Sequence, residues 1–296
     1  MTHPLIQHLA SYTLASESDC RLTLASVIAG YPVLLEGLPG VGKTGLALGV
    51  AQALALDFKR LQCTPDTQPA DITGYLRPDP GGQNFVFVEG PVFTPCLLVD
   101  EINRANPRSQ AALLEAMAEG TVSVEGQTHS LPPERVILAT QNPQDQIGTQ
   151  ALPESQLDRF GVVLTLGYPD AEKESAVIAR QLDTPPAAPA LDLLDTRASV
   201  RGVVTNDQAL GYLTRLIQAT RSATDFRHGL STRGALVLAD LARALAFLDR
   251  RDFVAPDDVQ QAFLPVARHR LTLNTPGAAA LTPDSRLMEV IQGIAL

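Results

Sequence analysis

The stretch Gly37-Leu38-Pro39-Gly40-Val41-Gly42-Lys43-Thr44 fits the pattern G-x-x-x-x-G-K-[ST], which is a phosphate-binding loop. An apolar run at residues 33–36 precedes it and predicts a buried strand, and apolar residues recur at helical spacing over residues 46–54. The glycines therefore lie where a strand turns into a helix, which is the context that the motif requires. A plain glycine-rich turn is the alternative, but it does not account for Lys-Thr at the start of the helix.

The chemistry of phosphate binding follows from this local geometry. Glycines allow successive backbone N–H groups to point into one concavity, and the positive end of the following helix faces the same spot. Lys43 can reach the β- and γ-phosphates, and the Thr44 hydroxyl can bind Mg²⁺. We therefore predict that the phosphates are bound by Gly37, Pro39, Gly40, Val41, Gly42, Lys43, Thr44 and Gly45.

Length and composition limit the class of protein. The 296 residues suffice for a large core and two domains, and 45% of them are hydrophobic, which is typical of a globular chain. The formal net charge of −9, from 23 basic and 32 acidic residues, argues against nucleic acid as a partner. The three cysteines lie far apart and form no metal-ligand spacing, so we expect buried free thiols.

Neither a signal peptide nor a membrane span is expected from the sequence. The opening Thr2-His3-Pro4 is followed by only a short mixed segment, which is not typical of a signal peptide. The longest apolar tract, residues 235–248, is interrupted by Asp240 and Arg243, and it is too short and too charged to cross a bilayer. We therefore expect a cytoplasmic protein.

A second apolar run, residues 96–99, ends in the two carboxylates of Asp100 and Glu101. Carboxylates at the end of a buried strand are costly without partners, and Mg²⁺ with an attacking water would supply them. Asp100 would hold Mg²⁺, and Glu101 would orient or deprotonate the water. A surface acidic turn is the alternative, but the phosphate loop upstream favours the catalytic interpretation.

Two more polar residues stand beside predicted strands. The apolar run at residues 136–140 is followed by Asn142, which could hold the attacking water at the carboxyl edge of the sheet or simply form the turn before Pro143. Arg159 precedes the strand expected at residues 162–166. It could be an ordinary salt-bridge partner or an arginine finger that reaches the phosphate of a neighbouring subunit.

Two hairpins are expected to interrupt the alternation of strands and helices. The first spans about residues 74–88 with a turn at Asp79-Pro80-Gly81-Gly82, and we favour a contact device over a simple extension of the sheet. The second spans about residues 121–131, and it could be a plain surface hairpin or have a working role. Between the strand expected at residues 58–63 and the first hairpin, residues 64–73 are polar and predict a loop.

After Pro169 the sequence pattern is almost wholly helical. Residues 185–189 are rich in proline and predict a linker, so we divide the chain into an α/β nucleotide-binding domain, 1–190, and a helical domain, 191–296. This division makes the fold class α/β with a smaller all-helical C-terminal domain.

The helix starts of the C-terminal domain are predicted from capping residues. Thr205 and Gln208 are expected to form a capping box, and Ser231 is expected to cap a helix whose first turn contains Arg233. A cation in a first turn is disfavoured by the helix dipole, by about a few tenths of a kcal/mol. A nearby anion would remove this objection.

From about Leu24 to near Leu273 the chain resembles the MoxR family of AAA+ ATPases. The phosphate loop is common to many ATPases, whereas several longer strings are more specific to this family. The motifs that carry the resemblance are Leu35-Glu36-Gly37 with the loop, Thr64-Pro65-Asp66, Asp71-Ile72-Thr73-Gly74, Glu89-Gly90-Pro91-Val92-Phe93, Val99-Asp100-Glu101-Ile102-Asn103-Arg104, Ala112-Leu113-Leu114-Glu115-Ala116-Met117, Ala139-Thr140-Gln141-Asn142-Pro143 and Leu152-Pro153-Glu154-Ser155-Gln156-Leu157-Asp158-Arg159-Phe160.

The resemblance implies roles for several residues. It implies a P-loop core with a five-stranded parallel sheet and a small helical lid, and it makes the two expected hairpins the helix-2 insert and the pre-sensor hairpin. It also makes Asn142 sensor 1, Arg159 the arginine finger and Arg233 the sensor-2 arginine. Ser231-Thr232-Arg233 stands where the family usually has Ser-Pro-Arg, and Gly42 stands where many members have alanine.

The resemblance further implies an ATP-hydrolysing remodeller or chaperone with ATP and Mg²⁺ as cofactors. Such proteins resemble hexameric rings that act on a protein client to aid maturation or cofactor insertion, often with a partner carrying a von Willebrand factor A domain. ATP would bridge the core and the lid, and Arg159 would arrive from the next subunit.

Two alternatives to this function stay open. The first is a nucleotide-dependent binding scaffold with negligible turnover, against which the Asp100-Glu101 pair and Arg159 argue. The second is a DNA-directed motor, against which the net charge argues.

Overall fold

A parallel five-stranded sheet forms the centre of the computed structural model, which describes residues 3–82, 84–143, 148–179, 191–274 and 283–294. The strands lie in the order β2-β5-β8-β1-β9, and each pair of neighbours is parallel. They are β1 (Val33–Glu36), β2 (Phe58–Gln62), β5 (Cys96–Asp100), β8 (Val136–Gln141) and β9 (Val162–Thr165). The five-stranded parallel sheet that the resemblance implies is confirmed.

Both faces of the sheet are covered because its inner strands are apolar along nearly their whole length. Alternate residues point to opposite faces, so Leu98 and Leu138 join one hydrophobic cluster whereas Leu97 and Ile137 join another. Helices later in the chain also join the first cluster, but in the region before β9 three helices contribute to it and two contribute to the second. These helices are α1 (Pro4–Tyr12), α2 (Glu17–Ala29) and α3 (Lys43–Ala53) on the first side, and α4 (Pro69–Thr73) and α5 (Pro107–Glu119) on the second.

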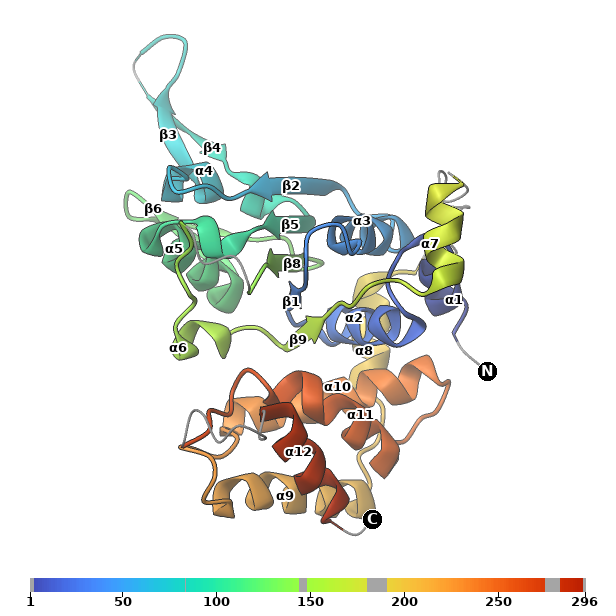
Figure 1. The fold of residues 1–296 in the computed structure, drawn as a ribbon. Helices are drawn as coiled ribbons and strands as arrows, with labels where there is room; N and C mark the ends of the chain where they lie inside the picture. Colours follow the sequence, from blue (N-terminus) through green and yellow to red (C-terminus); the bar gives the residue numbers. More distant parts are fainter. Residues whose placement is uncertain (1–2, 83, 144–147, 180–190, 275–282, 295–296) are drawn as a thin grey trace.

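In its described residues, the part of the chain that follows β9 contains helices and no named strand, as the resemblance implies for a lid. Its helices α9–α12 form a lobe below the sheet-containing region, and α10 faces that region (Figure 1). Helix α7 (Ala171–Ile178) still belongs to the sheet-containing region. The helices after it are α8 (Leu193–Arg201), α9 (Asp207–Ser222), α10 (Thr232–Leu248), α11 (Pro256–Ala267) and α12 (Pro283–Gln292).

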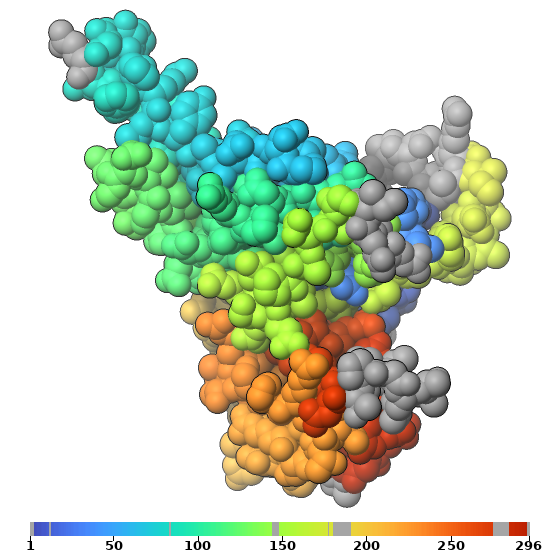
Figure 2. Space-filling model, turned by 60° about the vertical axis from the view of Figure 1, so that its left-hand side comes forward, coloured from blue at the N-terminus to red at the C-terminus, as the bar shows by residue number. Residues whose placement is uncertain are grey.

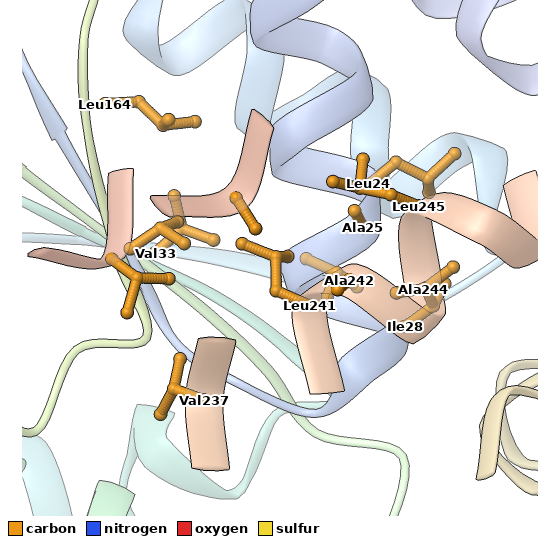
Figure 3. Close-up of a cluster of buried hydrophobic side chains, with 14 of the residues drawn as sticks. Leu24, Ala25, Ile28, Val33, Leu164, Val237, Leu241, Ala242, Ala244 and Leu245 are labelled. Atoms are coloured by element: carbon orange, nitrogen blue, oxygen red, sulfur yellow. The ribbon is translucent and has the colours of Figure 1, made fainter. Parts of the chain in front are cut away.

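Helix α10 packs directly against α2 (Figure 3). Leu24, Ala25 and Ile28 of α2 and Leu241 and Leu245 of α10 are at most 1% exposed and belong to one hydrophobic cluster. Full burial of one leucine or isoleucine side chain contributes about 1.5–3 kcal/mol. The helical lobe therefore shares a continuous core with the sheet region.

Polar contacts fasten the same two helices near both ends of α2. Arg21 forms a bidentate ion pair with Asp249, with N–O distances of 2.7 and 2.8 Å. At the other end, the Tyr31 hydroxyl donates to Asp240 Oδ2 at 2.8 Å. These contacts fix the rotation of the lobe relative to the sheet.

Both expected hairpins are present. The first, β3 (Gly74–Pro78) with β4 (Phe85–Glu89), projects away from the body (Figures 1 and 2). The second pairs β6 (Thr121–Val124) with β7 (Gln127–Ser130). Three short elements complete the fold: η1 (Pro91–Phe93), η2 (Ile102–Arg104) and α6 (Glu154–Leu157).

Two local predictions are wrong. The segment 64–73 is not a loop throughout, because Pro69 starts the short helix α4 and the Asp71 carboxylate accepts from the Gln68 N–H at 2.8 Å. The capping box is not formed by Thr205 and Gln208. Asn206 caps α9 instead, and its side chain accepts from Ala209 N–H at 2.9 Å.

Other predictions are confirmed or lie outside the described residues. Ser231 caps α10 as expected, and all three cysteines are buried free thiols. Within the described parts of the chain, no helix combines the length and the apolar character that crossing a bilayer requires. The proline-rich linker at 185–189 lies outside the described residues, and the domain division at 190/191 stays a prediction.

Candidate functional site

The phosphate loop connects β1 to α3, and its backbone requires glycine at two positions. Gly37 has φ +152°, and a Cβ there would lie 2.6 Å from the Leu166 carbonyl oxygen. Gly42 is the left-handed N-cap of α3 at φ +90°, and a Cβ there would lie 2.7 Å from Leu14 Cβ. The N-terminal end of α3 therefore faces the concavity of the loop with no side chain in between.

A cavity of about 400 Å³ opens above this loop at the carboxyl edge of the sheet. It brings together most of the residues predicted to bind nucleotide or to act on it. Its lining consists of Pro39, Gly40, Gly42, Lys43, Thr44, Gly45, Arg60, Asp100, Glu101, Thr140, Gln141 and Asn142. Gly37 and Val41 do not line it, and the Val41 side chain is 2% exposed and part of the hydrophobic core.

Lys43 begins α3 and its ammonium group stays inside the loop. Nζ donates to the carbonyl oxygens of Gly37 at 2.6 Å and Leu38 at 2.9 Å. Burial lowers the pKa of Lys43 below its usual 10.5, although Asp100 and Glu101 act in the opposite direction. The lysine is thus held by uncharged carbonyls next to the open cavity, where a phosphate would be a stronger partner.

Asp100 ends β5 and is 7% exposed, with two partners from neighbouring strands. Arg60 of β2 donates to Oδ2 from Nε at 2.9 Å, and the Thr140 hydroxyl of β8 donates to Oδ1. Thr140 Oγ1 also accepts from the Glu101 N–H at 2.9 Å. The two carboxylates are therefore oriented by the strands on either side of β5.

Glu101 has an unusual backbone conformation for a residue with a side chain, φ +55° and ψ +51°. Such a conformation costs of order 1–3 kcal/mol and is concentrated at functional sites. Its carboxylate accepts from Gln62 Nε2 at 2.8 Å and pairs with Arg104 Nε at 3.1 Å. Glu101 is thus turned toward the β2 side of the cavity.

The donor set of this cavity fits Mg²⁺. Magnesium prefers oxygen ligands and is usually held by one or two carboxylates together with phosphate oxygens. Thr44 and Asp100, which line the same cavity, supply a hydroxyl and a buried carboxylate. Among the described residues, no group of three His, Cys, Asp or Glu forms a self-sufficient metal site, so phosphate oxygens would have to complete the shell.

The structure places the predicted arginines at the opposite edge of the sheet. Arg159 precedes β9, and it lines a second cavity of about 220 Å³ together with Arg233 and Arg270. The same cavity is lined by residues 30–32, which precede β1, and by Arg135, which precedes β8. Because all strands are parallel, this is the amino edge, and β1 alone separates the edges by about 13 Å.

The carboxylate of Asp158 lies among these arginines. Arg270 Nε donates to its Oδ1 at 2.8 Å, and Arg233 Nη1 lies 3.6 Å from its Oδ2. Asp158 is thus the anion that offsets the unfavourable position of Arg233 in the first turn of α10. Arg159 Nη1 donates to the Leu114 carbonyl at 2.8 Å.

One prediction about the site needs correction. We expected ATP to bridge the core and the lid, and the resemblance made Arg233 the sensor-2 arginine. The packing of α10 against α2 instead places Arg233 beside Arg159 at the amino edge, away from the phosphate loop of the same chain. Glu101 and Asn142 do lie together with the loop, as predicted.

The two hairpins contact each other. Phe87 of β4 stacks on His129 of β7 with ring centroids 3.9 Å apart, and Phe93 approaches Phe87 edge-on at 5.5 Å. At the tip of the first hairpin, Phe85 is 69% exposed. The hairpins therefore contact each other through aromatic rings, and the first one presents an exposed apolar side chain next to its turn.

Sequence reasoning missed several residues of the two sites. Arg60 and Gln62 alternate along β2, and Gln62 is in register with Asp100 of β5. A polar residue at every second position of a strand before the carboxylate pair is a signal that could have found them. Arg270 follows α11 without any recognisable motif, and only the tertiary structure reveals its contacts.

Two family patterns match the chain. The family described as "ATPase family associated with various cellular activities (AAA)" matches residues 32–162, and the one described as "AAA lid domain" matches residues 218–290. The first range contains all residues that line the cavity above the phosphate loop as well as Arg159, and the second contains Arg233 and Arg270.

Several proteins are similar to the chain over most of its length. Identity is 38% to the uncharacterised protein YeaC of Bacillus subtilis, over 92% of this chain and 88% of YeaC. It is 37% to the chaperone MoxR1 of Mycobacterium tuberculosis, over 92% of this chain and 76% of MoxR1. It is 30% to the protein MoxR of Paracoccus denitrificans, over 93% of this chain and 90% of that protein.

A solved structure shares the complete fold. The crystal structure of a Cytophaga hutchinsonii protein, described as a candidate ATPase, superposes with a TM-score of 0.88 at 32% identity. The match covers 98% of this chain and 93% of that chain, so the relation includes both the sheet region and the helical lobe.

Proposed function

The chain belongs to the MoxR family of AAA+ ATPases, and from this membership and the geometry of its site we propose that it hydrolyses ATP between two copies. The reaction would serve to remodel a protein client. The observation that carries the proposal is the separation of Glu101 and the phosphate loop from Arg159 and Arg233 by the sheet of one chain.

This separation supports a proposal about assembly. A contact between the carboxyl edge of one copy and the amino edge of the next is heterologous, because it joins two different surfaces. Heterologous contacts produce closed rings when the rotation between copies closes. We propose a ring, hexameric as in the family that the chain resembles, in which each triphosphate receives Arg159 and Arg233 from the neighbouring copy.

Each residue of the carboxyl edge has a role in the proposed reaction. Lys43 and the loop N–H groups bind the phosphates, while Thr44 and Asp100 would hold Mg²⁺, which supplies charge neutralisation at the phosphate oxygens. Asn142 holds the attacking water, and Glu101 accepts its proton as the oxygen bonds to the γ-phosphorus. The bond to the bridging oxygen breaks, and ADP leaves.

The arginines of the neighbouring copy would act on the charge of the transferring group. An arginine finger stabilises the negative charge that develops on the equatorial oxygens, and it accelerates transfer by about 10³–10⁵-fold. The cluster of Arg159, Arg233 and Arg270 against the carboxylate of Asp158 leaves a net positive charge that suits this task.

For the client and the partner we propose only the class of molecule. The name of the relative MoxR1, a chaperone, supports a protein client, and the exposed tip of the β3–β4 hairpin is a surface on which a client could bind. A partner carrying a von Willebrand factor A domain is proposed from the family resemblance alone. Affinity capture with a Glu101→Gln variant in ATP would identify what stays bound.

Phosphate release at steady state tests the proposed function. The wild-type protein should release phosphate from ATP, and Glu101→Gln should lower kcat by about 10²–10⁴-fold while ATP still binds, because the general base is lost. Lys43→Ala should instead lose ATP binding. Negligible release by the wild-type protein would favour a nucleotide-dependent scaffold, and undiminished release by Glu101→Gln would remove Glu101 from its role.

A further inference from the structure

Arg270 lies shortly after α11, and its side chain is 3% exposed. An arginine has five N–H donors, and all five are used here. Nε donates to Asp158 Oδ1 at 2.8 Å, Nη1 donates to the carbonyls of Gly161 and Val266, and Nη2 donates to the carbonyls of Asp158 and Phe160. Four of these bonds end on the short segment between α6 and β9.

The segment that Arg270 holds is the one that carries Arg159. Two of the bonds end on the backbone carbonyls of Asp158 and Phe160, which flank Arg159 directly. Beyond it, Phe160 is fully buried and the Gly161 N–H donates to the Pro32 carbonyl at 2.8 Å. The backbone on both sides of Arg159 is therefore fixed, and Arg270 supplies much of that fixation.

Arg270 also influences Arg233 through a shared carboxylate. Asp158 Oδ1 accepts from Arg270, and Asp158 Oδ2 lies 3.6 Å from Arg233 Nη1. Arg270 is buried, whereas the Arg233 side chain is 61% exposed. The buried Arg270 thus orients the Asp158 carboxylate, and this carboxylate in turn orients the exposed Arg233 side chain.

We propose that Arg270 is a positioning residue that sets the place of Arg159 and Arg233 for the triphosphate of the neighbouring copy. The inference rests on the proposed function. Although Arg270 lines the second cavity, its side chain is 3% exposed and its five donors are all used within the chain, so it acts through the backbone around Arg159 and through Asp158. Because it lies in the helical lobe, it also couples the position of the lobe to the position of the arginine finger.

The first test compares Arg270→Met with Arg268→Met. Methionine keeps the apolar stem of Arg270 but removes all five donors, so Arg159 should lose its fixed position. A misplacement of about 1 Å can cost about 10²-fold in rate, so we expect kcat to fall between tenfold and 100-fold. The affinity for ATP should stay within about twofold, because the loop of the same chain is at the other edge.

Arg268 provides the matched control. It lies two residues before Arg270 and pairs with Asp284 rather than with the finger segment. Arg268→Met should therefore leave kcat within about twofold of the wild-type value. An unchanged kcat in Arg270→Met, or an equal fall of kcat and ATP affinity, would overturn the positioning role.

Mixed oligomers separate this inference from the proposed function. Subunits with Glu101→Gln cannot hydrolyse ATP but still supply intact arginines, so mixing them with Arg270→Met subunits should restore activity. Mixing Glu101→Gln with Arg159→Ala subunits tests the shared site itself. If only the mixture with Arg159→Ala regains ATPase activity, Arg270 does not act on the neighbouring copy. If neither mixture regains activity, the proposed shared site is wrong, and the positioning role of Arg270 is wrong as well.

A milder substitution covers the case in which Arg270→Met fails to fold. Arg270→Lys retains the charge beside Asp158, but its three donors extend from one atom and cannot hold both carbonyls that flank Arg159. We expect kcat to fall at least tenfold in Arg270→Lys, with a melting temperature close to that of the wild-type protein. Full kcat in this variant would overturn the proposal.

Discussion

The two edges of the central sheet differ in how they are built. At the carboxyl edge, the phosphate loop, Asp100 and Glu101 follow strands directly, so the local chain positions them. At the amino edge, Arg159 is placed by a segment that Arg270 of the helical lobe holds, and Arg233 is carried by the lobe itself. One half of the proposed site is therefore a property of the sheet, whereas the other depends on the packing of the lobe.

This difference separates binding from turnover. A copy with a damaged amino edge retains its own phosphate loop and should still bind ATP. A copy with a damaged carboxyl edge can still offer arginines to its neighbour. Variants at the two edges should therefore change different kinetic quantities.

The largest contrast is expected from Arg159→Ala. Loss of an arginine finger should lower kcat by about 10³-fold, because the charge on the transferring phosphoryl group loses a cation. The dissociation constant for ATP, measured with a fluorescent analogue, should change by less than about twofold. If the affinity for ATP fell together with kcat, Arg159 would act on the nucleotide of its own chain. The two edges would then not differ in function as proposed.

A smaller effect is expected from Arg60→Met at the carboxyl edge. Arg60 donates to the Asp100 carboxylate and would compete with a bound Mg²⁺ for it, so removal of the guanidinium should lower the half-saturating magnesium concentration at saturating ATP. Because the Arg60 side chain is 49% exposed, we expect a change of only about two- to fivefold.

Lys59→Met is the control for this measurement. Lys59 precedes Arg60 on the same strand and points to the opposite side, so the magnesium requirement should not change. A higher magnesium requirement in Arg60→Met would mean that Arg60 assists binding of the metal-bound nucleotide rather than opposing it.

The smallest effect concerns acid sensitivity at the amino edge. His269 is buried next to Arg270, and burial together with that charge holds its pKa well below the usual 6.5. Below pH 6.5 His269 is protonated in the unfolded chain but stays neutral in the folded chain. Its contribution to the free energy of unfolding is therefore fully present above pH 6.5 and is lost as the pH falls below that value. One such group contributes at most about 1.4 kcal/mol per pH unit.

Thermal unfolding at pH 7.5 and pH 5.5 measures this contribution. His269→Gln should show a smaller fall in melting temperature between the two pH values than the wild-type protein. His228→Gln, at an exposed position, should behave like the wild type. An equal fall in His269→Gln would show that the acid sensitivity originates elsewhere.

The carboxyl edge could be predicted from sequence because its signals are local. A strand, a glycine pattern and a helix start follow one another over residues 33–54, and the carboxylates end an apolar run. The partners of those carboxylates could not be predicted, because Arg60 and Gln62 reach them through the register of β2 with β5. Register depends on the whole sheet rather than on a short stretch.

The amino edge shows the limit of local signals more clearly. Arg159 and Arg233 were singled out, but their common location depends on α10 packing against α2, across some 200 residues of sequence. Arg270 has no motif, since a buried arginine with five partners cannot be told from a surface arginine in a single sequence. The cap of α9 illustrates a smaller failure, because Thr205 and Asn206 are adjacent residues of which either can cap a helix.

The central claim is that one copy alone contains only half of a working site. Specific ATPase activity at a series of protein concentrations, with the oligomeric state followed by sedimentation at each one, tests it most directly. Activity per protomer should approach zero where only monomer is present and should rise as larger species form. Full activity per protomer in the monomeric range would contradict it.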